Sequence, residues 1–421
     1  MLLARAARRA TPAPRRPPPQ ITEKFPLSGN IVLTTCSSML EHMSHLRAVP
    51  SSPVATAIEF FAGIGLARAG MAEAGIHTIW ANDYDLNKQK MYAQQWGAGA
   101  YQLEDVFKLD ASQVPTADLA WSSSPCTDLS LAGKRSGIGG AESSAFFGFT
   151  NVLREMKSRC PSVVVLENVN GLASSHGGDD LRAAIHEFND LGYAVDAVTI
   201  DARRFVPQSR PRLFVIGAVD PIDGGTQDTT LRPDLLSWVH EDQNLRTFHY
   251  PFPVAPAPLT DGFTALTENI SEEDPRWWDE PRVSAFFDSM SPTQRDRADS
   301  FISGTETVAR TAYRRTRNGV PTWEMRAQDI SGCLRTARGG SSKQAVAFMG
   351  KGQKKVRWMT GLEYARLMGA GWYNINGLRE SQTHYGFGDA VAVPVVSWLA
   401  NEALLPLIKN TREGRHREHA N

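Results

Sequence analysis

A cysteine directly after a proline is the first feature of this sequence that could do chemistry. Residues 121–131 (WSSSPCTDLSL) begin at the end of an apolar run and place Cys126 after Pro125 in a turn of small residues. Proline fixes its own backbone angle and favours an extended residue before it, so the cysteine is predicted to lie on a stiff loop. A thiolate there can act as a nucleophile. Most single cysteines are instead packing residues, and on this loop alone that interpretation stays open.

A glutamate at the end of a very apolar strand is the second such feature. Residues 162–172 (SVVVLENVNGL) form a Val/Leu run that ends at Glu167. A strand this apolar is typical of the inside of a parallel sheet, whose ligand crevice lies at the carboxyl ends of the strands. We therefore expect Cys126 and Glu167 to share one crevice. The alternative is a structural carboxylate that neighbouring backbone satisfies, although burying an idle carboxylate is costly.

A glycine turn between a strand and a helix predicts a ligand site. Residues 56–61 (TAIEFF) read as a buried strand, and Gly63 and Gly65 follow it before a helical pattern. This arrangement lets backbone approach a ligand at a helix N-terminus. The third glycine of a dinucleotide fingerprint is displaced, with Arg68 and Ala69 in its place, so a nicotinamide cofactor is not favoured.

Carboxylates follow the next two predicted strands. Residues 77–85 (HTIWANDYD) form a short strand that reaches Asp83, where such folds bind ribose hydroxyls. Asp85 suits the N-cap of the following helix better. Asp105 follows the third predicted strand. It could cap a turn, or it could accept a hydrogen bond from an adenine amine. Near the last strand, residues 205–212 hold Arg210 and Arg212 two apart, so both could face the crevice or simply pair with surface carboxylates.

Taken together, strands and helices alternate from residue 55 to about residue 219, which predicts an α/β domain with a mostly parallel sheet. The motifs FAGIG, SPCTDLS, ENV, QSRPR and GFGDAV, with Asp83 and Asp105 among them, occur in the order and spacing of the DNA cytosine-5 methyltransferases, of the bacterial modification-methylase type, which the chain resembles from Ala55 to its C-terminal helix. The sequence departs from that family at Thr127, where Gln is usual, and at Asp389, where Asn is usual.

The resemblance implies roles for the candidate residues. Cys126 would add to carbon 6 of cytosine, a protonated Glu167 would hydrogen-bond at N3, and Arg210 would contact the base O2 and steady the cysteine region, with Arg212 as a second contact. The cytosine would be flipped out of the duplex. Residues 132–140 resemble the loop that closes over the base, where Lys134 and Arg135 could meet phosphates.

The same resemblance implies S-adenosyl-L-methionine as methyl donor and no metal in a Rossmann-like methyltransferase domain. The expected cofactor contacts are Phe61, Gly63, Gly65, Asp83, Asp105, Pro125 and Val391. The donor would lie over Phe61 and the two glycines, with its ribose on Asp83 and its adenine near Asp105.

Length and composition set the expected domains. The 421 residues hold four cysteines, Cys36, Cys126, Cys160 and Cys333, without a C-x-x-C pair, which argues against a zinc site or a disulfide framework. No apolar run appears long enough to span a membrane. The expected segments are 1–52, a disordered basic and proline-rich tail; 53–220, the catalytic and cofactor domain; 221–345, a smaller irregular target-recognition domain; 346–409, the return to the catalytic domain; and 410–421, a frayed tail. A transit peptide or a nonspecific polyanion-binding arm are alternatives for the first of these.

Charge points to a nucleic-acid partner. The 45 basic and 45 acidic residues balance, but residues 310–357 are strongly basic, and their position matches the recognition domain of the resembled family. The expectation is therefore a monomeric bacterial cytoplasmic, nucleoid-associated enzyme that acts on double-stranded DNA, with a possible cognate restriction endonuclease. The alternatives are a tRNA cytosine-5 methyltransferase, a catalytically silent DNA-binding protein of the same fold and, more remotely, an NAD-dependent oxidoreductase.

Overall fold

The computed structural model describes residues 53–125, 144–336 and 343–420, with side chains up to residue 417, and they belong to one compact unit. Several expectations fall outside these residues: those for the tail 1–52, for Cys126 and Thr127, and for the loop 132–140 with Lys134 and Arg135.

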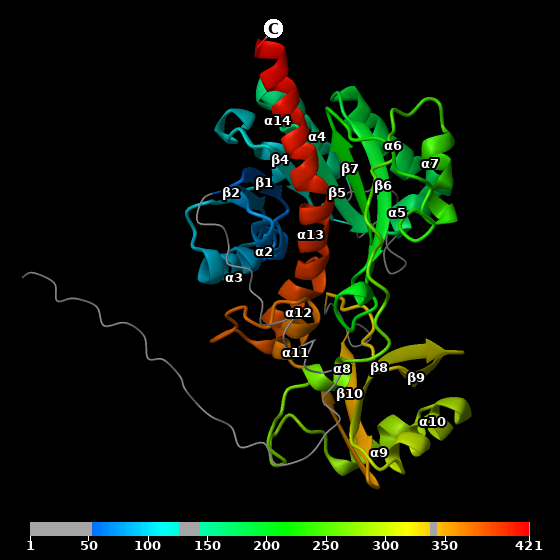
Figure 1. The fold of residues 1–421 in the computed structure, drawn as a ribbon. Helices are drawn as coiled ribbons and strands as arrows, with labels where there is room; N and C mark the ends of the chain where they lie inside the picture. Colours follow the sequence, from blue (N-terminus) through cyan, green and yellow to red (C-terminus); the bar gives the residue numbers. More distant parts are fainter. Residues whose placement is uncertain (1–52, 126–143, 337–342, 421) are drawn as a thin grey trace, which may run out of the picture. The chain divides into compact units, whose positions relative to one another are not determined.

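A seven-stranded sheet lies at the centre of the α/β part (Figure 1), with the strand order β3-β2-β1-β4-β5-β7-β6. Its first five strands run parallel, and only β7 is antiparallel to its neighbours, so the expected mostly parallel sheet is confirmed. The strands are β1 (Ala55–Phe60), β2 (Ile76–Asp83), β3 (Tyr101–Leu103), β4 (Leu119–Ser122), β5 (Val163–Val169), β6 (Ala194–Asp201) and β7 (Pro211–Ala218).

Alternating residues of β1 divide the core between the two faces of this sheet. Ala55 and Ala57 pack on the side of α2 (Leu66–Glu73) and α13 (Val393–Leu399). Ile58 and Phe60 pack on the other side, against α4 (Ala145–Met156) and α6 (Asp179–Asp190). This period of two is what a strand buried on both faces requires. The remaining helices of this part are α3 (Leu86–Trp96), α5 (Gly171–Ser174) and α7 (Ser237–Glu241).

The segment that follows β7, expected to open a target-recognition domain at residue 221, instead covers the edge strand β6 of the large sheet. Val195 N donates to Arg246 O at 2.9 Å, and Thr199 N donates to Leu231 O at 2.7 Å. Arg232, which is 1% exposed, forms a buried ion pair with Asp196. These contacts satisfy the free edge of β6, so residues from 221 to about 250 pack with the large sheet.

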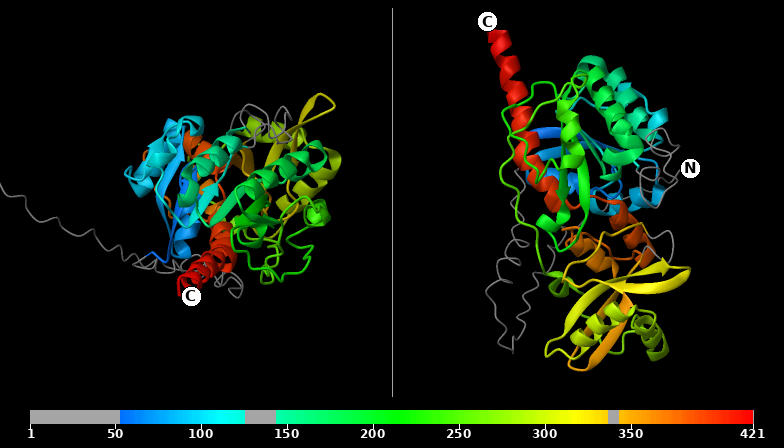
Figure 2. Two further views of the ribbon diagram at one scale, coloured as in Figure 1. Left: turned by 90° about the horizontal axis from the view of Figure 1, so that it is seen from above. Right: turned by 90° about the vertical axis from the view of Figure 1, so that its right-hand side faces the viewer.

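A second, antiparallel sheet has the order β11-β10-β8-β9, and most of it lies in the segment for which the sequence predicts a target-recognition domain; this part of the structure is called the recognition part. Its strands are β8 (Val308–Arg317), β9 (Val320–Met325), β10 (Gln344–Gly350) and β11 (Gln353–Trp358), so it extends past the boundary expected at residue 345. Helices α9 (Glu280–Asp288) and α10 (Pro292–Ile302) lie against one face (Figure 2), over a core that includes Trp278 and Phe286. Asn318 and Gly319, with φ of 50° and 80°, close the β8–β9 hairpin.

The chain then returns to the large sheet through α11 (Gly361–Leu367), α12 (Glu380–Asp389), α13 and α14 (Leu405–Ala420), with the short α8 (Phe263–Leu266) earlier in the chain. The capping box expected from Thr360 and Glu363 is confirmed at α11. GFGD was expected to be a turn, but it is the end of α12. Its glycines serve close packing instead, since a Cβ on Gly388 would lie 2.6 Å from Arg335 O. The tail after Lys409, expected to be frayed, continues α14, and Thr411 within it is 1% exposed.

One helical run, Glu380–Arg417, is long and apolar enough by length and composition to cross a membrane, although the sequence suggested no such run. Of its most apolar window, 61% is buried against the rest of the protein. The core helix of a globular protein meets the same criterion, so this run is weak evidence for a membrane span.

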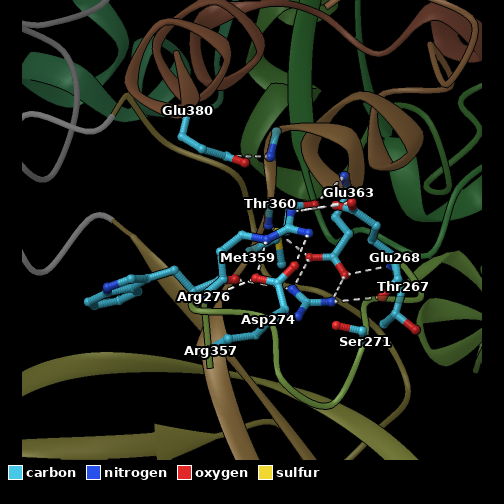
Figure 3. A network of polar contacts seen from close by, with 12 residues as sticks. Thr267, Glu268, Ser271, Asp274, Arg276, Arg357, Met359, Thr360, Glu363 and Glu380 are labelled. Carbon is cyan, nitrogen blue, oxygen red and sulfur yellow. Dashed lines mark hydrogen bonds and ion pairs between the residues drawn. The ribbon is translucent and has the colours of Figure 1, made fainter. Parts of the chain in front are cut away.

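A buried ion-pair network joins β11 to the start of α11 (Figure 3). Arg357, which is 0% exposed, donates to both carboxylate oxygens of Glu363, at 2.5 and 2.8 Å. The same carboxylate accepts from Thr360 N and from Glu268 N, both at 2.9 Å. Arg357 also donates to Glu268 O at 3.2 Å. Each charge is therefore compensated inside the protein, as a buried pair requires.

Candidate functional site

The residues of the glycine loop after β1 are needed for different physical reasons. Phe61, Gly63 and Gly65 all have positive φ, of 56°, 56° and 80°. A Cβ on Gly65 would lie 2.4 Å from Trp96 Nε1, so packing alone requires glycine there. On Gly63 the nearest atoms would be Lys88 Cδ at 3.9 Å and Phe61 O at 4.0 Å, which are ordinary contact distances, so a Cβ there would meet no clash. The strained, less tightly packed part of the loop is therefore the part that a ligand can approach.

Asp83 holds this loop in place. Its side chain is mostly buried, and it accepts from Gly63 N at 2.9 Å and from Asp85 N at 3.0 Å. Burial raises the pKa of Asp83, an effect that nearby Lys88 opposes. Asp85 caps α3 by accepting from Asn87 N and Lys88 N, as the sequence suggested. The contact between Asp83 and a ribose stays a prediction.

Asp105 accepts from Phe107 N at 3.1 Å and so caps a short turn, one of the two roles expected of it. Two exposed aromatic residues that the sequence analysis passed over stand beside these carboxylates. Tyr84, next to Asp83, is 62% exposed, and Phe107 is 56% exposed. Their sequence signal is an aromatic residue one or two positions after each acid. Rings left this exposed at the carboxyl ends of strands are candidates for stacking on a planar ligand.

The end of β5 contacts the segment that leads to the predicted nucleophile. Asn168 Nδ2 donates to both the backbone oxygen and Oγ of Ser124, each at 3.3 Å. Ser124 is buried, and Pro125 beside it is half-buried. Cys126 itself lies outside the described residues. The contact nonetheless links the ENV and SPC motifs, whose shared crevice the sequence predicts.

Glu167 forms an ion pair with Arg212. Arg212 Nε lies 3.2 Å from Glu167 Oε1, and their side chains are only 15% and 10% exposed. The two residues come from neighbouring antiparallel strands, since Val169 of β5 pairs with Arg212 of β7. Water competes little at this depth, so the pair is held more firmly than a surface ion pair.

Arg210 is placed differently from Arg212. It is 2% exposed, and its guanidinium donates to the backbone oxygens of Leu334, Gly388 and Ala390 at 2.7, 3.1 and 2.6 Å. A further donor contacts Cys333 Sγ at 3.3 Å. Burial lowers the pKa of Arg210. The guanidinium thus ties two distant backbone segments together, and its contact with a base stays a prediction.

Cys333, for which no role was predicted, contacts Arg210 through its Sγ. Its backbone oxygen accepts from Tyr313 Oη at 2.9 Å. Burial disfavours its thiolate, but the charges of Arg210, Arg212 and Arg335 outweigh that effect and lower the pKa of the thiol. No local motif marks this residue, because its neighbours come from three separate segments of the chain.

The last motif contributes an ion pair at the unusual position Asp389. Lys88 Nζ lies 2.9 Å from Asp389 Oδ2, and Thr336 Oγ1 donates to the other oxygen. The charge of Asp389 raises the pKa of Lys88, against the effect of burial. Val391 follows in the link between α12 and α13 and is 5% exposed. Among the described residues, no group of three or more His, Cys, Asp or Glu side chains could hold a metal ion.

Comparisons with known proteins agree with this arrangement. The family model for C-5 cytosine-specific DNA methylases matches residues 55–404. Type II methyltransferase M.HhaI of Haemophilus parahaemolyticus is 29% identical over 160 residues, covering 38% of this chain and 47% of that protein. Type II methyltransferase M.DsaV of Dactylococcopsis salina is 26% identical over 349 residues, covering 82% of this chain and 85% of that protein.

The match spans only about half the length of several curated relatives, with 47%, 51% and 50% of their sequences covered. Among solved structures, the S. pombe Dnmt2 methyltransferase has a TM-score of 0.54 at 16% identity, covering 84% of this chain and 99% of that chain. At this identity the likeness bears on the fold alone. The family model covers most of the sequence and includes every described motif, and the chain therefore belongs to the C-5 cytosine-specific DNA methylase family.

Proposed function

We propose that this protein transfers a methyl group from S-adenosyl-L-methionine to carbon 5 of a cytosine in double-stranded DNA. The observation that carries the proposal is the contact between the ENV and SPC segments. Asn168 bonds to Ser124, two residues before Cys126, while adjacent Glu167 faces Arg212. This contact supports the expectation that a nucleophile, a carboxyl group and a cation share one crevice, which is the set that addition to a pyrimidine ring needs.

The residues around the glycine loop fit the methyl donor. A Cβ on Gly63 would meet no clash, and Asp83 accepts a hydrogen bond from Gly63 N. The exposed residues Tyr84 and Phe107 follow Asp83 and Asp105 in the chain. We expect Phe61, Gly63, Gly65, Asp83 and Asp105 to hold it, with Pro125 and Val391 at its border. When bound, it supplies a methyl group on a sulfonium.

The protein's own residues prepare the cytosine. Cys126 forms the bond to carbon 6, and Glu167, once protonated, donates to ring N3 and so relieves the charge that the addition creates. Arg212 is 3.2 Å from Glu167 and is the arginine we assign first to the base O2. Arg210 has donors already engaged by backbone oxygens, which supports a positioning role for it.

The finer features of the proposal follow from the family and the chemistry. Because carbon 5 lies within the base stack, the cytosine must be flipped out of the duplex. We propose a short specific recognition sequence and action as a monomer in the bacterial cytoplasm. A cognate restriction endonuclease is part of the same proposal.

Bisulfite sequencing tests the function directly. Genomic DNA from a methylation-free bacterial host that expresses the chain should show protected cytosines within one short motif. Cys126→Ser should abolish the protection. The matched Cys160→Ser should retain it, because Cys160 precedes β5, at the opposite end of the strand from Glu167, and its Sγ lies 3.0 Å from Tyr193 Oη. If folded wild-type protein leaves every cytosine convertible, the DNA assignment fails, and the same assay on tRNA then separates an RNA methyltransferase from a silent binder.

A further inference from the structure

Two histidines stack on one another where the segment after β7 covers the edge of the large sheet. This segment, residues 221–252, is called the strap. The rings of His240, in α7, and His249 have their centres 3.8 Å apart, with an angle of 23° between their planes. The residues just before His249 lie along β6, where Thr247 forms a bridge with Val195. The stack therefore joins α7 to the part of the strap that lies on the edge strand.

A buried carboxylate of β6 lies beside the stack. His240 Nε2 is 3.4 Å from Asp196 Oδ1, and the two side chains are 5% and 0% exposed. Asp196 already has a cation, because Arg232 donates to both of its oxygens, at 2.9 and 2.5 Å. It also accepts from Tyr250 N at 3.0 Å. The carboxylate is therefore engaged without a charged histidine, and each proton on the stack adds a charge beyond the one that Asp196 balances.

The remaining groups around the stack are neutral or already engaged. His249 Nε2 lies 3.3 Å from Gln227 Oε1, which carries no charge. Asp223 Oδ1 accepts from the backbone N of His249 at 3.0 Å. Just after α7, Asp242 forms an ion pair with Arg182 of α6, so those two charges compensate one another. The surroundings thus offer little to stabilise a second imidazolium ring.

These surroundings favour a neutral His249. Burial lowers its pKa from the ordinary value of 6.5, and the charges of His240 and Arg232 lower it further, although Asp196 and Asp223 oppose them. When the strap is open, the ring regains the ordinary value. The stability that the neutral ring gives to the closed strap is therefore fully present above pH 6.5 and is lost as pH falls through the lowered pKa.

The end of the strap supports the C-terminal helices. Tyr250 Oη donates to Glu402 O at 2.7 Å, in the π-helical turn Ala400–Leu404 that links α13 to α14. Phe252 stacks on Trp398 of α13, with 5.7 Å between the ring centres and 15° between the planes. Helix α13 in turn packs against α2, which begins directly after the glycine loop. The strap therefore contacts the helix that backs the predicted donor site.

Two imidazolium rings at this separation repel one another, and the buried acid beside them is already neutralised by Arg232. We propose that His240 and His249 form an acid-sensitive clasp: when both rings are protonated, the strap leaves the edge of β6 and withdraws its support from α13. Because α13 packs on α2, an open strap does not bind the methyl donor, a consequence that rests on the proposed function.

Amide hydrogen exchange at about pH 7.5 and about pH 5.5 tests the opening. The amides of Val195, Thr199 and Phe248 donate between β6 and the strap, so opening exposes them. After correction for intrinsic exchange rates, their opening constant should rise about tenfold on acidification, since a ring that titrates at 6.5 only when the strap is open contributes about that factor. Amides of β5, inside the sheet, should stay protected at both pH values.

His249→Phe keeps an aromatic ring in the stack but cannot be protonated, so the tenfold rise should vanish. His186→Gln is the matched control, because it removes a half-buried histidine of α6 that lies outside the stack, and it should keep the rise. The imidazole proton resonances of the wild type give a second measurement that needs no variant to fold. They should show a pKa for His249 below 6.5.

Bound donor tests whether the opening reaches the donor site. Saturating S-adenosyl-L-methionine should slow exchange of the same three amides by about tenfold or more at neutral pH, because it binds only the closed strap. Exchange that bound donor leaves unchanged would limit the clasp to the edge of the sheet and refute its link to the donor site. A wild type that binds no donor would refute the proposed function, while the pH dependence still decides the clasp.

Four results would overturn the clasp itself. Strap amides that open equally at both pH values are not controlled by a histidine. A rise that persists in His249→Phe places the titrating group elsewhere. A pKa of His249 at or above 6.5 removes the cause of the opening. Loss of protection in β5 together with the strap would mean that the sheet unfolds as a whole.

Discussion

Lys88 Nζ lies 2.9 Å from a carboxylate oxygen of Asp389, across two motifs that are about three hundred residues apart in the chain. The resembled family usually has Asn at this position, which would leave the lysine facing Asp83 alone. Here the acid and the lysine compensate one another at the border of the predicted cofactor site. The acid at this unusual position therefore has a compensating partner in Lys88.

Asp389→Asn should destabilise the protein. The side chains of Lys88 and Asp389 are 16% and 31% exposed, and removal of one charge strands the other, at a cost of roughly 1–2 kcal/mol. Urea unfolding measures this cost, and a double-mutant cycle with Lys88→Met isolates the pair. Asp288→Asn, which breaks a surface pair with Arg295, serves as control and should cost less than about 0.5 kcal/mol. Equal losses of unfolding free energy in Asp389→Asn and Asp288→Asn would contradict the pairing.

Arg210→Lys and Arg212→Lys should fail in different ways. Lysine cannot replace the four contacts of the Arg210 guanidinium, so the free energy of unfolding of Arg210→Lys should fall by roughly 3 kcal/mol. Arg212→Lys should unfold almost normally but lower kcat by about a hundredfold, since Arg212 Nε lies 3.2 Å from Glu167 Oε1. Urea unfolding and single-turnover methyl transfer are measured on each variant. If Arg210→Lys instead lowers kcat and Arg212→Lys instead destabilises the fold, the base contact belongs to Arg210.

Substitution of the two loop glycines should separate ligand binding from packing. Gly65→Ala puts a Cβ 2.4 Å from Trp96 Nε1 and should destabilise the fold by ~2 kcal/mol or more. The Cβ of Gly63→Ala meets only ordinary contacts, the nearest being Lys88 Cδ at 3.9 Å, so this substitution should cost ~1 kcal/mol for its positive φ while weakening S-adenosyl-L-methionine binding. Calorimetric titration and thermal unfolding are the measurements. Unchanged donor affinity in the folded Gly63 variant would move the donor away from this loop.

Glu59 should make stability depend on pH. It is 1% exposed in β1, and burial raises its pKa to about 8 from the ordinary value of 4.5. The folded state therefore keeps a proton that the unfolded chain loses, so the contribution is fully present below 4.5 and is lost as pH rises through about 8. Urea unfolding across this range should show the wild type weakening relative to Glu59→Gln, by on the order of a few kcal/mol. If the difference in unfolding free energy between the wild type and Glu59→Gln stays constant across this pH range, the pKa of Glu59 is not raised.

Local rules account for much of the fold that the sequence predicted. The N-cap at Asp85 and the capping box at Thr360 and Glu363 depend on residues two or three apart, and both are confirmed. The apolar run that ends at Glu167 predicted a strand inside the sheet, and β5 lies there. Such features need only the neighbouring residues to be recognised.

What the sequence left undecided depends on distant partners. Arg210 and Arg212 look alike in QSRPR, yet one is enclosed by backbone oxygens from residues 334 and 388–390 while the other meets Glu167. The end of α12 was expected as a turn because glycines favour turns. There they admit Arg335 O and the side chain of Met91 instead, which only the packed helix reveals.

The Arg357–Glu363 pair has a consequence for engineering. The carboxylate of Glu363 caps the start of α11 and also neutralises Arg357 of β11. The strand and the helix therefore stabilise one another. A chimera that exchanges the recognition part at residue 345 would cut through β10 and separate a strand from its ladder. A graft whose second junction lies beyond Glu363 carries both halves of the ion pair and so keeps this strand and helix together in the hybrid protein.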